Sequence, residues 1–418
     1  MRDPLSSYNK CLSDGRIAFT YSSFRFYMAA RFLATASSEM QAVAVGWQIY
    51  GLTGRPLDLG LVGLAQFLPG ILLFLIAGHA ADRFPRRRIL EICYAGFAAC
   101  SLALLALTVH GLTSVYPIYA VLLANGVVRA FNGPASQALL PQVIAEEHFP
   151  NAVAWGSSIF QGAQVAGPML GGFVYGFAAT PIPVYAGAAT AFLTALCLMA
   201  MVHTIGHQRP RGVASLSFVL DGLRYIRRNK IILGTISLDL FAVLLGGAVA
   251  LLPVYAREIL RTGAFGLGVL RAGPGIGAVL MAIVVAHYPL RRRAGRTMLW
   301  CVAGFGAFTV VFGLSRNFAL SMAALVGVGA CDMVSVIVRH TLVQLGTPDE
   351  MRGRVSAVNM VFIGASNEVG QFESGVTAQW LGAVPAVLLG GVGTMIVVAL
   401  WAKLFPALRR VDQLVRKD

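Results

Sequence analysis

Ionisable side chains lie inside long apolar stretches of this chain, where a charge is energetically expensive. A charge near the centre of a bilayer costs at least about 2.5–3.5 kcal/mol, so such a residue usually faces the interior of a helix bundle and acts there. The carboxyl groups among them can take up and release a proton, and the guanidinium groups can pair with them. The residues of this kind are Arg31, Glu39, Arg129, Asp239, Arg271, Asp332, Arg339, Glu368 and Glu373.

Glu39 and Asp239 are the acids that we expect to carry a proton. Neither has a basic residue close to it within its own apolar segment, and surroundings of low dielectric constant favour the neutral form of a carboxyl group. Glu368 and Glu373 come next. They are five residues apart, which is about 140° around a helix, so we do not expect both to face one cavity equally. For each of these acids, a structural ion pair that merely holds helices together is the alternative.

An internal repeat relates the charges of the two halves of the chain. Residues 138–172 align with residues 341–375 at an offset of 203, and Gly167 then falls on Gly370. The same offset places Asp332 on Arg129, so opposite charges occupy matching depths. We expect this pair to form an electrostatic latch or part of a substrate site. The other candidates for the substrate cavity or latch are Arg31, Arg339, Gln41 and Gln164.

Membrane-spanning helices are the elements that must position these residues. Of the 418 residues, 57% are hydrophobic and 12% are charged, whereas a soluble domain has about 25% charged residues. The apolar runs are long enough to cross about 30 Å of hydrocarbon and lack the alternation of barrel strands. The sequence predicts an all-α integral membrane protein with twelve spans, near residues 24–51, 57–81, 89–110, 116–140, 151–176, 183–203, 231–256, 265–288, 297–315, 318–345, 355–380 and 383–405.

The one long connection between predicted spans divides the chain into two six-helix halves. Two parallel repeats joined by a linker are typical of transporters whose halves rock around a site near the membrane midplane. The predicted parts are an N-terminal cytoplasmic segment (1–23), an N-terminal half (24–203), a cytoplasmic linker (204–230), a C-terminal half (231–405) and a cytoplasmic tail (406–418).

Basic residues gather on one side of the predicted topology. The connections on the side of the two termini contain 23 Lys and Arg residues, and those on the opposite side contain 4. This bias predicts a multi-pass membrane protein with both termini in the cytoplasm. It also accounts for the net charge of +15. Nucleic-acid binding would need a basic face on a soluble domain, and the composition excludes one.

Motifs for catalysis are missing from the sequence. The six cysteines and seven histidines have no metal-ligand or redox spacing, and there is no nucleotide-binding loop of the form G-x-x-x-x-G-K-[ST]. We therefore expect no enzymatic activity, no cofactor, no metal site and no use of ATP. The expected partners are a small-molecule substrate, protons and the lipid bilayer, with the protein acting as a monomer.

Three motifs in register resemble those of the major facilitator superfamily. The loop between the second and third spans resembles that family's signature, with Pro85 where glycine is usual, through Gly78, Asp82, Arg83, Arg86, Arg87 and Arg88. Arg129-Ala-Phe-Asn-Gly133 resembles the Arg-x-x-Gln-Gly element, with Asn132 in place of Gln. The fifth span resembles the motif of exporting antiporters through Gly162, Gly167, Pro168, Gly171 and Gly172. The segments FRFYMAARFLATASSEMQAVAVGWQIY and TPDEMRGRVSAV are most similar to the branch that holds the enterobactin exporter and macrolide-efflux proteins.

The resemblance implies roles for two of these motifs. In the family, an aspartate at the position of Asp82 caps the cytoplasmic start of the eleventh helix and holds an inner gate shut, for a gain of about 0.3–1 kcal/mol. The glycines of the fifth helix are implied to pack closely against the eighth helix, which has its own Gly273-Pro274-Gly275-x-Gly277. Topology alone would explain the arginines of the loop, and ordinary helix packing would explain the glycines.

The combined prediction is a secondary transporter of the bacterial inner membrane that exports a small organic molecule, either a drug or a siderophore-like compound, by alternating access and proton antiport. The alternatives are a facilitator or a lysophospholipid transporter of the same fold, and a membrane scaffold or receptor that does not transport. Only a proton antiporter would depend on a proton gradient, and a scaffold would tolerate neutralised buried acids.

Overall fold

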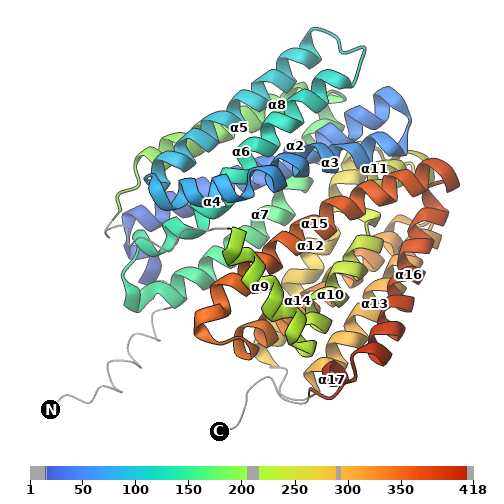
Figure 1. The fold of residues 1–418 in the computed structure, drawn as a ribbon. Helices are drawn as coiled ribbons and strands as arrows, with labels where there is room; N and C mark the ends of the chain where they lie inside the picture. Colours follow the sequence, from blue (N-terminus) through green and yellow to red (C-terminus); the bar gives the residue numbers. More distant parts are fainter. Residues whose placement is uncertain (1–14, 16, 205–215, 289–292, 412–418) are drawn as a thin grey trace.

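The computed structural model describes residue 15 and residues 17–204, 216–288 and 293–411, which fold almost entirely into helices, with no strand among them (Figure 1). Most of the predicted N-terminal segment and tail, and part of the linker, lie outside the described residues. The principal helices are α2 (Ser22–Thr53), α3 (Pro56–Leu72), α4 (Phe74–Arg83), α5 (Arg86–Val109), α6 (Tyr116–Leu139), α7 (Phe149–Ala178), α8 (Ile182–Ala200), α9 (Leu216–Arg228), α10 (Lys230–Leu245), α12 (Gly263–His287), α13 (Ala294–Leu314), α14 (Phe318–Gly346), α15 (Asp349–Leu381) and α16 (Ala383–Leu404). Short turns complete the described elements: η1 (Ile17–Thr20), η2 (Leu140–Gln142), η3 (Glu146–His148), η4 (Ala248–Leu251), α11 (Leu252–Val254), the π-helical η5 (Tyr255–Ile259) and α17 (Pro406–Arg409).

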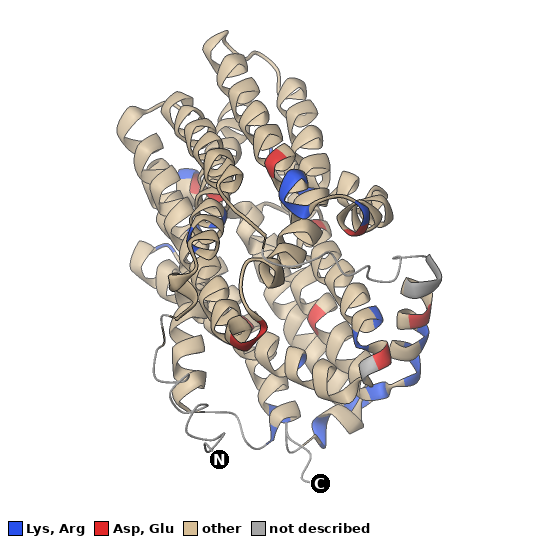
Figure 2. Ribbon diagram, turned by 90° about the vertical axis from the view of Figure 1, so that its left-hand side faces the viewer, with Lys and Arg blue, Asp and Glu red and all other residues tan. Residues whose placement is uncertain are grey.

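Seven helices in the described part of the chain are long and apolar enough to cross a membrane, or up to eight if α3 and α4 are one bent span. Four further helices, α2, α6, α7 and α15, are 24 to 33 residues long but less uniformly apolar. Charged residues are sparse and occupy a few short segments of the ribbon (Figure 2). The all-α membrane fold is confirmed, whereas the count of twelve spans stays a prediction.

Two predicted spans are interrupted. The span predicted at 57–81 bends by 56° between α3 and α4, just after Pro69, which cannot donate a backbone hydrogen bond within the helix. The span predicted at 231–256 is α-helical to Leu245, breaks at Gly246 and Gly247, and continues to Ile259 through the short helical elements η4, α11 and η5. Periodicity in the sequence does not reveal either break, because the apolar composition continues through both.

The predicted linker contains a helix. Residues 216–228 form α9, which packs on the first turns of α15 through Ile226, Val355 and Val358. An ion pair of 3.1 Å between Asp221 and Arg354 holds the same two helices together. Asn229 then accepts hydrogen bonds from the first amides of α10, so α10 begins directly where α9 ends.

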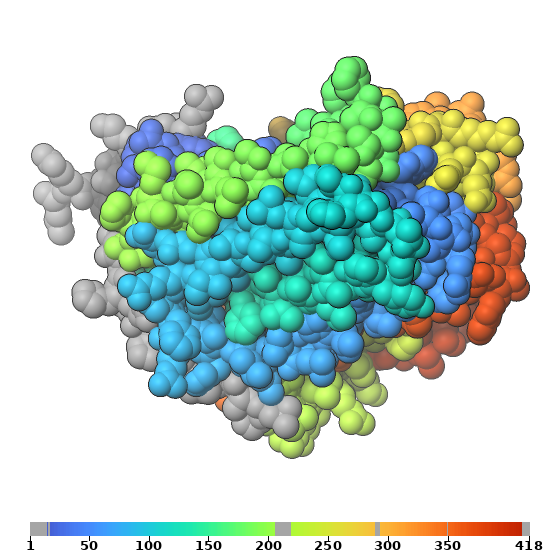
Figure 3. Space-filling model, turned by 90° about the horizontal axis from the view of Figure 1, so that it is seen from above, coloured from blue at the N-terminus to red at the C-terminus, as the bar shows by residue number. Residues whose placement is uncertain are grey.

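Helices α2–α8 form an N-terminal group and helices α10–α16 a C-terminal group, and the two lie side by side (Figures 1 and 3). Contacts between the groups come mainly from α7 with α12 and from α3 with α15. We call the end of the bundle where α2 ends and α3 begins the shared end. There, one hydrophobic core combines Tyr50 and Leu59 with Leu251 and Tyr255.

At the opposite end, where α4 meets α5, each group has its own core. The core around Phe24, Leu139 and Val202 contains residues of the N-terminal part of the chain alone. The core around Met298 and Leu408 contains residues of the C-terminal part alone. We call this the separate end. The two groups therefore share one hydrophobic core at one end of the bundle and have individual hydrophobic cores at the other.

Candidate functional site

Two ion pairs join the N-terminal group to the C-terminal group near the middle of their helices. Arg129 on α6 lies 3.3 Å from the Glu368 carboxylate on α15. Glu39 on α2 lies 3.6 Å from the Arg271 guanidinium on α12. Arg271 and Glu39 are also close enough to act electrostatically on Glu368. We call these four residues the central charge cluster; it balances two acids against two arginines.

The side chains of the central charge cluster are only partly buried. The Arg129 side chain is 59% exposed and Glu368 is 13% exposed, while Glu39 and Arg271 are each 25% exposed. The Gln371 amide donates a hydrogen bond of 3.1 Å to the second oxygen of Glu368. Each pair joins helices from different groups, so a rocking motion that separates the groups must break or exchange these contacts.

Asp239 has a basic partner, although no basic residue lies close to it within its own predicted span. Arg339 of α14 donates a hydrogen bond to the Asp239 carboxylate, and both side chains are buried, at 3% and 6% exposed. Both residues belong to the C-terminal group. Glu39 likewise has a basic partner, Arg271, from another helix. Sequence distance within a helix could not exclude such partners, because both come from elsewhere in the bundle.

Arg129 and Asp332 do not pair in this structure. Arg129 contacts Glu368 instead, and Asp332 takes part in no ion pair with any described residue. Glu373 accepts a hydrogen bond from the Thr377 hydroxyl on its own helix, so Glu368 and Glu373 have different partners. Pairing of Arg129 with Asp332 stays a prediction for another state.

The remaining cavity candidates lie inside the N-terminal group or at its edge. Arg31 lies 5.5 Å from the Phe160 ring centroid, against α7. Gln41 is buried and accepts a hydrogen bond from the Ser101 hydroxyl of α5, so its amide is engaged inside this group. Gln164 is partly buried on α7, at the level of Gly275 on α12.

The α7 glycines face two different helices. A β-carbon added at Gly167 would lie 2.5 Å from the Ala36 carbonyl oxygen and 2.7 Å from the Glu39 β-carbon, both on α2. One added at Gly171 would lie 2.6 Å from the Met40 carbonyl oxygen, also on α2. The expectation that Gly167 packs against the eighth helix is therefore wrong. Gly167 instead allows α7 to pack closely on α2 beside Glu39, a residue of the central charge cluster.

Close packing of α7 on α12 depends on a different pair of glycines. A β-carbon at Gly172 would lie 2.6 Å from the α-carbon of Gly268, and one at Gly268 would lie 2.5 Å from the Pro168 carbonyl oxygen. Gly162, by contrast, has open space beside it. On α12, Gly273 and Gly277 pack against α14 rather than α7, so only part of each glycine motif serves the contact between the groups.

The loop motif lies at the separate end. Gly78, Asp82 and Arg83 are on α4, whose neighbour is α6. No hydrogen bond or ion pair among the described residues joins Asp82 to α15. The gate contact implied by the motif is thus not formed in this state. Arg86 and Arg87 donate instead to helix-end carbonyls, Arg86 to that of Ala138 and Arg87 to that of Ala200.

A set of contacts at the shared end was not foreseen from the sequence. The Tyr50 hydroxyl at the end of α2 donates a hydrogen bond to the Glu258 carboxylate of η5. The Arg257 guanidinium lies 5.7 Å from the Trp47 ring centroid, as in a cation–π contact. We call these four residues the outer latch. The adjacent opposite charges of Arg257 and Glu258, at the end of a predicted span, are the sequence signal for it.

Comparison with known proteins identifies relatives over the whole fold. A family model described as transmembrane secretion effector matches residues 17–417. The enterobactin exporter EntS of Shigella boydii serotype 4 (strain Sb227) is 26% identical over 382 residues, covering 90% of this chain and 86% of the relative. The same protein of Escherichia coli O9:H4 (strain HS) matches with the same identity and coverage.

Solved transporter structures share the fold. The nucleoside transporter NupG superposes with a TM-score of 0.67 at 14% identity, covering 92% of this chain and 99% of that one. A D-xylose-proton symporter gives a TM-score of 0.68 at 15% identity, covering 93% and 99%. A bacterial homologue of the iron transporter ferroportin gives 0.65 at 14% identity, covering 91% and 98%.

Proposed function

The chain belongs to the transmembrane secretion effector family, within the major facilitator transporters, and from this premise we propose that it exports a small organic molecule by proton antiport. Its family and relatives are transporters rather than enzymes. The relatives named as enterobactin exporters support export, and a drug or siderophore-like substrate follows from the same likeness. The observation that carries the coupling proposal is the central charge cluster, which connects the two groups.

In the proposed cycle, the two groups rock about the central charge cluster. The state described here has the shared end packed by α3 and α15 and held by the outer latch. Opening the shared end requires the outer latch to break and the separate end to close. In the closed separate end, Asp82 would reach the first turn of α15 and stabilise it as a helix cap.

Proton uptake at a cluster carboxylate is the proposed trigger. Protonation of Glu368 removes the charge that holds Arg129, and protonation of Glu39 does the same for Arg271. Either event weakens a contact between the groups and so alters the balance between the two states. Asp239 and Glu373 remain lower-ranked candidates, since neither contacts a residue of the N-terminal group among the described contacts.

The proposed orientation puts the separate end and both termini in the cytoplasm, from the bias of 23 basic residues against 4. In this orientation the end where each group has its own hydrophobic core lies on the cytoplasmic side, from which an exporter collects its substrate. We propose a monomer in the inner membrane of a bacterium, with the half-exposed Arg129 as the side chain that meets polar oxygen atoms of the substrate.

Proteoliposomes test the proposal. Purified protein is reconstituted with enterobactin as the probe, and a pH difference of one unit is imposed across the membrane. Coupling to one proton supports accumulation of up to about tenfold, and a protonophore should abolish it. Glu368→Gln and Glu39→Gln should each reduce this accumulation while counterflow exchange of substrate persists. Gly162→Ala, which has space for the added carbon, is the matched control.

The facilitator alternative predicts a different result. Substrate would equilibrate across the membrane at the same rate with and without the pH difference, and the two glutamine variants would behave like the parent. That result would remove proton coupling while keeping transport. Absence of any protein-dependent movement of the probe, or of a panel of drug-like substrates, would favour the scaffold or receptor alternative.

A further inference from the structure

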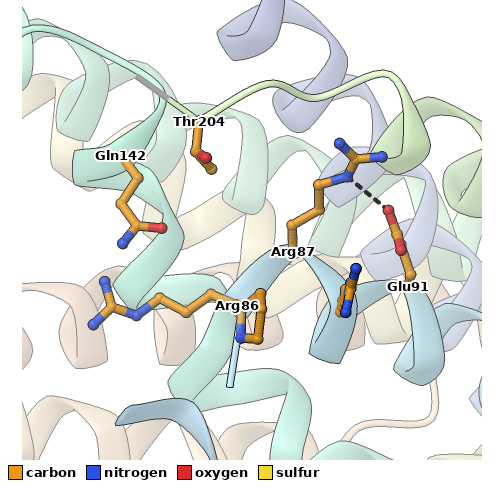
Figure 4. A pocket seen from close by; sticks show the side chains of 7 residues that line it. Arg86, Arg87, Glu91, Gln142 and Thr204 are labelled. Carbon is orange, nitrogen blue, oxygen red and sulfur yellow. Dashed lines mark hydrogen bonds and ion pairs between the residues drawn. The ribbon is translucent and has the colours of Figure 1, made fainter. Parts of the chain in front are cut away.

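A cavity of about 400 Å³ lies at the separate end, and no residue of the central charge cluster lines it. Figure 4 shows the side chains that line it. Its walls come from the start of α5, from η2 and from the chain just after α8. Arg86, Arg87 and Arg88 line it together with Glu91, Gln142 and Thr204. Three cations against one anion leave the cavity with positive charge. The volume is more than ten times the share of one water molecule, about 30 Å³.

Gln142 is the feature that points to a ligand. Its residue is 7% exposed, its side chain lines the cavity, and it makes no hydrogen bond or ion pair with any described residue. The amide atoms of Gln142 are not fully buried, because they border the space of the cavity, where a bound group can pair with them. An amide held unpaired in the wall of a positive cavity is suited to donate to an anion.

Two of the arginines keep donors available for such an anion. Arg87 is positioned by the Glu91 carboxylate at 2.7 Å and by the Ala200 carbonyl oxygen, also at 2.7 Å. Its guanidinium has five N–H groups, more than these two contacts use. Arg88 is exposed and makes no ion pair with any described residue. Guanidinium groups match the geometry of phosphate oxygens and can bind them through two parallel hydrogen bonds.

The backbone at the start of α5 adds to the positive potential of the cavity. Helix α5 begins at Arg86, and Pro85 before it provides no side-chain cap. The first amides of a helix lack partners within the helix, and the positive end of its dipole attracts anions. A helix start, two available guanidinium groups and the Gln142 amide therefore converge on one cavity.

We propose that this cavity binds a phosphate group, supplied either by the headgroup of an anionic phospholipid or by free phosphate. The cavity lies at the end of the bundle where the helices leave the membrane, and basic pockets at such positions are suited to anionic headgroups. Bound phosphate would tie the α5 start to η2 and to the end of α8. This assignment does not depend on the transported substrate.

Ligand-induced stabilisation of the purified full-length protein in neutral detergent tests the proposal. Short-chain phosphatidylglycerol, short-chain phosphatidylcholine and inorganic phosphate are titrated separately, and the melting temperature is followed at each concentration. Phosphatidylglycerol or phosphate should stabilise the parent, with phosphatidylcholine far weaker. Gln142→Met and Arg88→Gln should each weaken the apparent affinity about tenfold, as expected for one lost charge-assisted hydrogen bond.

Arg25→Gln is the matched control. Arg25 is exposed near the start of α2, beside Ser23, whose hydroxyl accepts a hydrogen bond from the His203 amide at the same end. The Arg25→Gln substitution removes one positive charge at this end without touching the cavity, so this variant should bind the anionic probes with the parent affinity. Because affinity comes from the titration midpoint, a variant of lower intrinsic stability still gives an answer.

The source of the phosphate follows from the two anionic probes. Stabilisation by phosphatidylglycerol alone supports a lipid headgroup, and stabilisation by millimolar inorganic phosphate supports a free ion. Equal affinity in the parent, Gln142→Met and Arg88→Gln overturns the proposal, because the effect would then be general surface charge. Equal effects of phosphatidylglycerol and phosphatidylcholine, with none from phosphate, also overturn it. Failure of proton-driven transport would leave these outcomes unchanged.

Discussion

Replacing Glu368 by glutamine tests whether the central charge cluster sets the balance between the two states. The nearest Arg129 nitrogen lies 3.3 Å from the carboxylate, which gives about 1 kcal/mol in water and about 5 kcal/mol at an effective dielectric constant of ~20. Arg129 is 59% exposed, so screening favours the lower figure, about 1 kcal/mol. A change of that size alters the ratio of the two states about fivefold.

The direction follows from the packing. Because the pair joins α6 to α15 while the shared end is closed, its loss should favour opening of that end. A minor state at about 5% would rise to about 20%. Double electron–electron resonance measures this opening as a distance between two spin labels. The labels are attached at His110→Cys and Arg316→Cys, which are exposed sites in the α5–α6 and α13–α14 connections. The native cysteines must be removed first, since Cys197 is exposed.

Glu373→Gln is the matched control, because it removes the same charge from the same helix without touching an arginine of the N-terminal group. Its distance distribution should match that of the parent. If Glu368→Gln also leaves the distribution unchanged, the contact between Arg129 and Glu368 does not contribute to the equilibrium. A shift of equal size in both variants would attribute the effect to the total charge of α15 rather than to the ion pair.

Three further substitutions separate structural from switching roles. Asp239→Asn should lower the free energy of unfolding by about 3–5 kcal/mol, because it leaves buried Arg339 unpaired. The double variant Asp239→Leu, Arg339→Met should recover most of that loss. Thermal unfolding in detergent measures both effects. Gly167→Ala should lower the free energy of unfolding by about 1–3 kcal/mol, because the added carbon forces α7 and α2 apart, and it should reduce transport. Gly162→Ala should do neither. Equal melting temperatures of the two variants would contradict this prediction. Asp82→Asn should speed labelling of a cysteine at the separate end of α15 about two- to fivefold, for a lost cap of about 0.3–1 kcal/mol, and unchanged labelling with unchanged transport would leave Asp82 without a gating role.

The sequence predicted which helices carry charge but not which charges meet. Glu39, Arg129, Arg271 and Glu368 were all identifiable, because each interrupts an apolar run. Their pairing depends on how helices distant in sequence are packed, and hydropathy contains no information on that. The repeat offset suggested Asp332 for Arg129, since it relates equivalent positions in the two halves. Equivalent positions are related by symmetry and need not be in contact.

The glycine motifs illustrate the same limit at the level of single residues. Their presence predicted close helix packing, and α7 does pack closely on α12 through Gly172 and Gly268. A motif read as one unit, however, assigns all its glycines to one partner. Gly167 and Gly172 are five residues apart and therefore face different sides of α7. Only the packed structure divides them between α2 and α12.

Access to water decides which buried acid is best suited to carry the proton. A coupling site must exchange protons with water in at least one state and must also feel the movement of the two groups. Asp239 is 6% exposed and its partner Arg339 is 3% exposed, and both belong to one group, so rocking of the groups need not disturb this pair. Glu368 is 13% exposed, and it contacts an arginine of the opposite group that is 59% exposed. Glu368 thus meets both requirements, and Glu39 meets them through Arg271. We therefore expect gradient-driven accumulation to be lost first in Glu368→Gln, whereas the buried pair of α10 and α14 should affect mainly the stability of the fold.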